Sequence, residues 1–163
     1  MEAFYQTLAG FCFTLLGLWW AVVQFRHEAW MAEARMRRMA YSVHLSFLVP
    51  GIMGMGAMAA GDIKLIWRLV FILAAAFGIA AQIFLLSGAR GAGQQPRRGR
   101  LLRPARWLTI ALYALIAVVA AAPALSGIFG AEMKPLQIEG LLLTLLVALG
   151  VSVAWDLLAE PAS

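Results

Sequence analysis

Residues 108–125 read LTIALYALIAVVAAAPAL, a predominantly apolar run without a charged side chain. The run does not alternate between apolar and polar positions, so it does not fit a strand of a membrane β-barrel. Its length is close to the roughly 20 residues that a helix needs to cross the hydrocarbon of a bilayer. The stretch therefore predicts a membrane-spanning helix.

The whole chain has the same character. Of its 163 residues, 63% are apolar and 13% are charged, and the mean hydropathy is +0.84. Soluble domains average about half apolar and about a quarter charged residues. One soluble core of this size cannot cover so much apolar surface, which excludes a soluble enzyme, a disordered tail and a free nucleic-acid-binding domain.

Five windows are long and apolar enough to span a membrane. We therefore expect an all-α fold, a bundle of five transmembrane helices that forms a single membrane domain over residues 1–163. The first window follows an acidic start, Met1-Glu2-Ala3, and exceeds the roughly 7–15 residues of a signal-peptide core, so we expect it to be retained. The windows are residues 4–23, 41–60, 65–86, 107–127 and 138–158.

Basic residues are concentrated in two of the four connections. Connection 24–40 contains four arginines and connection 87–106 contains six, together ten of the thirteen lysines and arginines. The other side has only Lys64, Arg68 and Lys134. The positive-inside rule then predicts an outer N-terminus and a cytoplasmic C-terminus in a bacterial-type inner membrane.

Aromatic residues mark the ends of the windows. Because amphipathic rings favour the headgroup level, we expect these residues at the membrane interfaces. They are Tyr5 and Trp67 on the outer side and Trp20, Tyr41, Trp107 and Trp155 on the inner side.

The two basic connections differ in kind. Residues 87–106 are rich in Gly and Pro, contain no acid and predict a flexible linker. Residues 18–49 contain no Gly or Pro. The first span is therefore expected either to continue as a helix or to be followed by a short surface helix. His27, Trp30 and nearby arginines would then form a cytoplasmic platform; the alternative is a helical hairpin with solvated charges.

The arginines of these connections suggest two roles. They bind anionic lipid headgroups or an acidic partner, or they serve only to set the topology. Nucleic acid is not expected as a partner, because no aromatic residues interleave with the arginines of 87–106. The candidate lipid- or partner-binding residues are Arg35, Arg37, Arg38, Arg97, Arg98, Arg100 and Arg103.

Small residues form a stripe on each predicted span, which favours close helix packing in lipid. On the first span the stripe contains Thr7, Gly10, Thr14, Gly17, Ala21 and Gln24, and we expect this face to pack. In the second span Pro50 predicts a kink near residues 46–51. The candidate pore or helix-packing residues are Thr14, Gly17, His44, Pro50, Gly51, Gly54 and Gln82.

Ionisable residues within the spans are few, and we expect no carboxylate deep in the bundle. His44, Arg68 and Asp156 all lie near span ends, and Arg68 is close enough to the outer surface for its side chain to reach it. We expect His44 to be a structural, hydrogen-bonded histidine; the alternative is that it senses pH or meets Asp156 across the bundle. The methionines do not form a series across the spans that could pass on copper. The single cysteine, Cys12, is expected to be a small buried apolar residue. No catalytic motif is present, so neither a metal nor a cofactor is expected.

The leading hypothesis is a non-enzymatic integral membrane protein that acts as an oligomer or as a subunit of a larger complex. Its most concrete form is a channel-like pore for small ions. One alternative is a structural or regulatory adaptor that uses the basic connections. A third hypothesis is a membrane-embedded enzyme that uses Asp62 with Glu132, or His27 with His44.

Overall fold

The computed structural model describes residues 1–61, 63–87, 102–124 and 134–159. Its helices are α1 (Glu2–Phe25), α2 (His27–Ala32), α3 (Ala34–Ala60), α4 (Lys64–Ser87), α5 (Leu102–Ala121) and α6 (Pro135–Ala159). All except α2 are long and apolar enough to cross a membrane. The described residues thus confirm an all-helical fold with five helices of spanning length.

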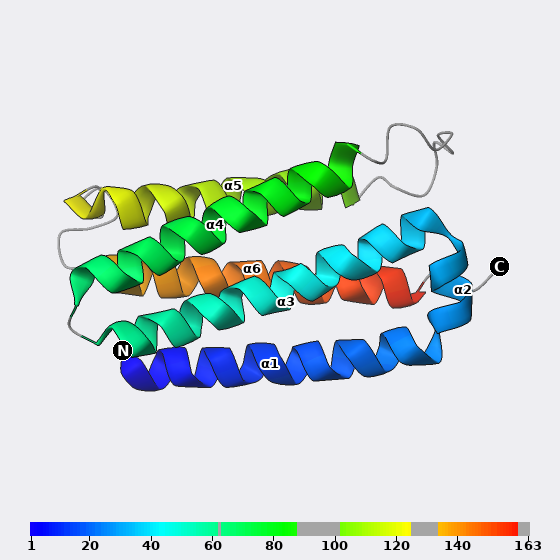
Figure 1. Cartoon of the computed structure of the whole chain (residues 1–163), viewed down its shortest axis with the longest axis horizontal. Helices are drawn as coiled ribbons and strands as arrows, with labels where there is room; N and C mark the ends of the chain where they lie inside the picture. Colours follow the sequence, from blue (N-terminus) through cyan, green and yellow to red (C-terminus); the bar gives the residue numbers. More distant parts are fainter. Residues whose placement is uncertain (62, 88–101, 125–133, 160–163) are drawn as a thin grey trace.

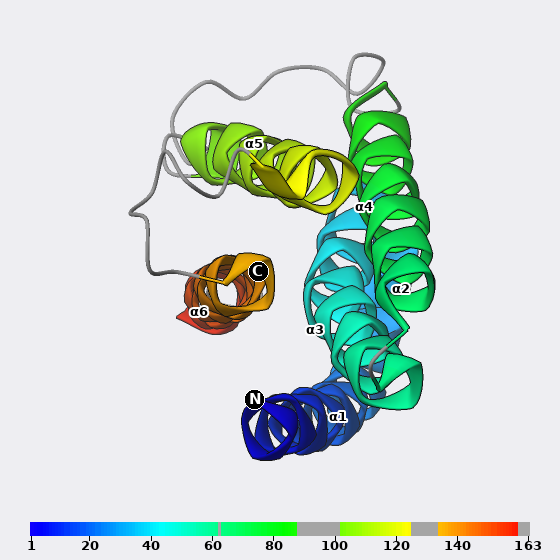
Figure 2. The ribbon, with the colours of Figure 1, turned by 90° about the vertical axis from the view of Figure 1, so that its left-hand side faces the viewer.

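The five long helices run side by side along the length of the molecule (Figure 1). Helices α1, α3, α4 and α5 form a curved layer in which each packs on the next, and α6 lies on its concave side against α3 and α5 (Figure 2). Helix α6 has a small contact with α1 and none with α4. The interior of the bundle therefore lies between α6 and the layer.

The connection between α1 and α3 is almost entirely helical. Two breaks, at Arg26 and Glu33, separate α2 from its neighbours, which matches the short-helix alternative for this segment. Trp30 of α2 is buried against Trp19 of α1, with ring centroids 5.7 Å apart, and the Arg26 guanidinium lies 5.8 Å from the Trp30 ring. The expectation that Trp30 belongs to a surface platform is therefore wrong, because burial of its large ring anchors α2 to the bundle.

Helix α5 ends earlier than the predicted window 107–127. Its last α-helical residue is Ala121, and a 3₁₀ turn follows at Pro123 and Ala124. Proline disfavours a helical conformation in the residue before it and has no N–H to donate. The end of the predicted window was set by apolar composition alone, and it therefore lies too far along the chain. Helix α5 instead extends backwards to Leu102.

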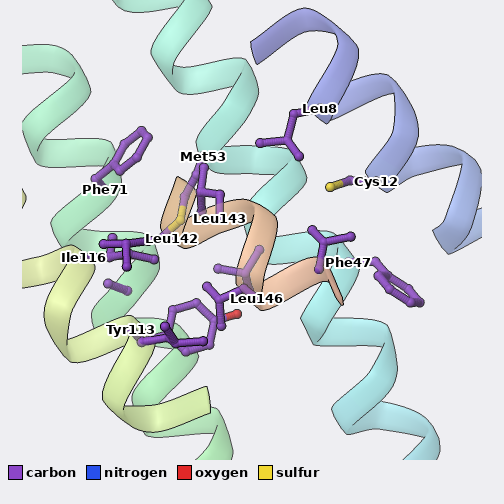
Figure 3. Close-up of a cluster of buried hydrophobic side chains, with 14 of the residues drawn as sticks. Leu8, Cys12, Phe47, Met53, Phe71, Tyr113, Ile116, Leu142, Leu143 and Leu146 are labelled. Atoms are coloured by element: carbon purple, nitrogen blue, oxygen red, sulfur yellow. The ribbon is translucent and has the colours of Figure 1, made fainter. Parts of the chain in front are cut away.

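The core of the bundle is apolar and draws on all five long helices. Figure 3 shows its central part, in which Leu142, Leu143 and Leu146 of α6 lie among side chains from the curved layer. The described core offers little space, and its polar groups lie at separate levels along the bundle. These polar groups form the candidate site. The labelled partners from the layer are Leu8, Cys12, Phe47, Met53, Phe71, Tyr113 and Ile116.

Candidate functional site

Glu139 lies inside the bundle at the end where α6 begins. Its side chain has 0% exposure, and neither carboxylate oxygen has a hydrogen-bond partner. It shares one face of α6 with Leu143, Leu146 and Gly150, since residues spaced by three and four lie above one another on a helix. This face meets α3, where the Cβ of Ser46 is 2.7 Å from the position of a Cβ added to Gly150. The expectation of no carboxylate deep in the bundle is therefore wrong.

Aromatic residues close the bundle near Glu139. The Tyr5 hydroxyl of α1 donates a hydrogen bond of 2.6 Å to the carbonyl of Leu136, one turn before Glu139. This hydrogen bond holds the Tyr5 ring against the first turns of α6. The Tyr5 ring meets Phe71 of α4 edge-on at 6.3 Å, and Trp67 meets the same ring at 5.9 Å.

This arrangement corrects the interface role predicted for two aromatic residues. Tyr5 and Trp67 are buried in the core rather than placed at a lipid boundary. The reason is that both rings pack on Phe71, and Tyr5 also reaches α6, so their apolar area is covered by protein. The four aromatic residues predicted at the inner boundary are exposed on the outside of the bundle: Trp20, Tyr41, Trp107 and Trp155.

A second polar cluster lies at the opposite end of the bundle, near α2. Ser42 of α3 and Gln82 of α4 are buried and pair through two hydrogen bonds of 3.3 Å. Ser46 donates to the Ser42 carbonyl and Thr109 donates to the Ala105 carbonyl, each at 2.9 Å. Because these two hydroxyls donate to their own helices, they offer acceptor oxygens to anything that enters the space between them.

A small cleft opens at this cluster between α3, α5 and α6. Its lining includes Ser42, Ser46, Arg106, Thr109 and Gly150. Gly150 contributes no side chain, which leaves the hydroxyls of α3 and α5 facing the cleft. We call this space the inner cleft.

Tyr113 lies between the inner cleft and Glu139. It is one turn further along α5 than Thr109, is 1% exposed, and its hydroxyl has no hydrogen-bond partner. Its ring packs directly on Gly78 of α4, where an added Cβ would lie 2.7 Å from the ring. Figure 3 shows it beside Leu146 of α6, which lies two turns along that helix from Glu139.

The predicted candidates of the second span lie at different places. Gly51 and Gly54 form the contact with α1, where an added Cβ would lie 3.3 Å from the Cβ of Cys12 and 3.2 Å from that of Ala9. Pro50 is fully buried inside an uninterrupted α3. These residues serve helix packing in the structure and do not line the inner cleft.

The remaining ionisable candidates have separate surroundings. His44 is half-buried, and its ring meets that of Trp20 on α1 edge-on at 5.6 Å. It forms no ion pair with Asp156, which is exposed. Arg68 is half-buried, and its Nε is buried without a hydrogen-bond partner.

The stripe predicted as the packing face of the first span lies on the outside of the described bundle. Thr14 and Gly17 are exposed, and nothing lies within 4 Å of a Cβ added to Gly10 or Gly17. Packing of this stripe against a second copy or another subunit stays a prediction. Helix α1 instead contacts α3 through Ala9 and Cys12, because the glycines of α3 accept larger partners.

The arginine candidates are only partly described. Arg97, Arg98 and Arg100 lie outside the described residues, as do Asp62 and Glu132 of the enzyme hypothesis, and the side chains of Arg35 and Arg103 are not described either. Arg37 is exposed and Arg38 is half-buried. Among the described residues, no group of three His, Cys, Asp or Glu is placed to hold a metal.

The missed residue, Glu139, had a recognisable signal. Its spacing from Leu143, Leu146 and Gly150 places it on the buried face of the last span. Counting apolar residues set the start of the predicted span at Ile138 and gave Glu139 no role.

Comparisons with protein-family models, characterised proteins and solved structures found no match for this chain.

Proposed function

We propose that the chain is a multi-pass protein of a bacterial inner (plasma) membrane that provides a channel-like route for a small ion and catalyses no reaction. The arginine distribution supports an outer N-terminus and a cytoplasmic C-terminus. In this orientation the inner cleft faces the cytoplasm and Glu139 lies near the outer surface.

The observation that carries the proposal is the enclosed Glu139 carboxyl. Burying an ionisable group in a membrane bundle is costly, and such residues usually mark ion pathways. Glu139 has no hydrogen-bond partner that would give it a structural role. The unpartnered Tyr113 hydroxyl and the inner cleft extend the polar groups towards the other end of the bundle.

The described conformation corresponds to a closed state of the proposed route. Leu143 and Leu146 lie between Glu139 and the inner cleft, along a rise of about 16 Å from Glu139 to Gly150. Apolar constrictions of this kind gate channels by excluding water. Opening requires α6 to move relative to α3 and α5, the two helices that hold it.

Flux through reconstituted protein tests the proposal. The purified chain is placed in liposomes that carry ion gradients, and ion movement is followed with internal dyes. Glu139→Gln removes the ionisable group at nearly constant shape, whereas Asp156→Asn makes the same change at an exposed position of the same helix. We expect flux that is lost in the first variant and retained in the second. Equal flux in both variants contradicts the role of Glu139. If liposomes that contain the unaltered chain pass ions no faster than liposomes without protein, the proposed function is contradicted.

The exposed face of α1 supports self-association as part of this function. Small residues on a lipid-facing surface permit close approach of a second helix, which is the usual basis of helix association in bilayers. We propose that copies of the chain, or another membrane subunit, pack on this face. The adaptor hypothesis stays a prediction, since most of its arginines or their side chains are not described.

A further inference from the structure

We infer that Glu139 is a proton-binding site, and that the ion handled by the bundle is H⁺, held on the enclosed carboxyl beside Tyr5. The transport part of this inference rests on the proposed function. The binding part rests on the surroundings of Glu139 alone.

The space at Glu139 favours a proton over any larger ligand. The side chain is wholly buried, and the described cleft lies at the other end of the bundle. The Phe4 ring covers Gly140 so closely that an added Cβ would lie 2.7 Å from it. An organic cation or a hydrated metal ion has no room in this arrangement, whereas a proton occupies no volume.

The available ligands favour the same conclusion. Calcium takes six to eight oxygen ligands and magnesium takes six. Glu139 supplies two oxygens, and the Tyr5 hydroxyl, which already donates to Leu136, supplies one more acceptor at most. No acidic cluster for a metal is present in the described part of the chain. One O–H bond satisfies the neutral acid without further ligands.

No opposite charge neutralises Glu139 within the described residues. On α1 the Tyr5 hydroxyl lies against the first turn of α6, while Glu2 and the N-terminal amine are exposed. The outer part of α3 carries no ionisable side chain, and that of α5 carries Tyr113. On α4, Lys64 is exposed, the buried Arg68 Nε has no hydrogen-bond partner, and no ion pair joins Arg68 to Glu139. Lys134, before α6, is exposed. An uncompensated buried carboxylate is very costly, so the enclosed form that this site accommodates is the protonated acid.

The binding step is a simple proton transfer. A hydronium ion at the opened site gives its proton to one carboxylate oxygen, which forms an O–H bond and leaves a water molecule. Release to water on the other side reverses the step, so the carboxylate is regenerated. The unpartnered Tyr113 hydroxyl lies between Glu139 and the inner cleft, where it is placed to accept and pass on a proton once water reaches it.

Infrared spectroscopy of the full chain in liposomes tests the site directly. At neutral pH the unaltered protein should show the C=O stretch of a protonated carboxylic acid, shifted on exchange into D₂O. Glu139→Gln should abolish this band, whereas Glu139→Asp and Asp156→Asn should retain it. The inference is overturned if the unaltered chain lacks the band, or if Glu139→Gln keeps it.

Ion flux separates this inference from the proposed function. With a proton gradient as the only driving force, we expect proton flux that falls by about 100-fold in Glu139→Gln. If only potassium or sodium crosses, and crosses equally well in Glu139→Gln, the channel function stands and the proton inference fails. If the infrared band is present but no ion crosses, the site stands and the function fails.

Discussion

The burial of the Glu139 side chain lowers the stability of the fold. Both of its carboxylate oxygens are enclosed and unpartnered, and a buried polar group without a hydrogen bond costs about 1–3 kcal/mol. Neighbouring α6 residues on the same face are leucines that fill the core. A leucine at position 139 would therefore suit the packing better than the native residue does.

We expect Glu139→Leu to stabilise the protein and to abolish its ion flux. The free energy of unfolding should rise by about 1–3 kcal/mol, because two unsatisfied polar atoms are replaced by apolar ones. Denaturant unfolding in detergent measures this change. Asp156→Leu, at an exposed site, provides the control and should give a much smaller effect. A less stable Glu139→Leu variant would mean that the carboxyl makes favourable interactions in its site.

Sequence reasoning identified some of the polar residues and missed others at this scale. The sequence favours Gln82 or Thr144 as the deepest strongly polar side chain; Gln82 is buried at 2% exposure, whereas Thr144 is exposed. Tyr113 was not considered, because tyrosine within an apolar run resembles any other core aromatic residue. Its unpartnered hydroxyl depends on where α4 and α6 place their neighbours, which no local pattern reveals.

At the scale of the elements, α1 and α3 approach each other closely at Gly54. A Cβ added to Gly54 would lie 3.2 Å from the Ala9 Cβ and 3.3 Å from the backbone oxygen of Tyr5. The backbone cannot move aside as a flexible side chain would. The absence of a side chain at position 54 thus determines how closely the two helices approach.

Gly54→Leu should therefore destabilise the bundle, by about 1–3 kcal/mol as is typical of overpacking. Gly10→Leu, the same change on a neighbouring helix, should have little effect on the fold of a single copy, since nothing in the described bundle lies within 4 Å of an added Cβ there. Thermal unfolding in one detergent compares the two variants. Equal losses at both positions would argue that glycine is needed for some other reason than the α1–α3 contact.

The existence of the helices was easier to predict than their ends or their partners. Apolar length alone identified the five long helices. The end of α5 depended on Pro123, and the separate α2 depended on the burial of Trp30, a tertiary contact. Every span carried small residues, so the pattern did not indicate that Gly51 and Gly54 would pair with Ala9 and Cys12 instead of with the glycines of α1.

At the scale of the whole molecule, the curved layer leaves one face of α1 uncovered. Helix α6 lies on the concave side, and the stripe that includes Thr14 and Gly17 faces outwards. Lipid solvates such a surface without penalty, but small residues also allow another helix to approach closely. We therefore expect this face of α1 to contribute to contacts between copies of the chain.

We expect Gly17→Leu to shift the purified particle towards a single copy, because the larger side chain blocks close approach between helices. Native mass spectrometry in detergent, or light scattering corrected for detergent, measures the particle. Phe11→Leu, at another exposed position of α1, should leave the mass unchanged. An assembly that survives Gly17→Leu, or a native chain that is already monomeric, would contradict packing through this face.

Cys12 is the one cysteine of the chain, and its side chain is wholly enclosed at the contact between α1 and α3. A water-soluble maleimide added to intact cells therefore finds no native thiol of this chain that it can reach. A cysteine introduced near one end of the chain would be the sole position of the chain able to react, and it would react only if that end lies outside. The compartment of each terminus can thus be read from labelling without first removing a native residue.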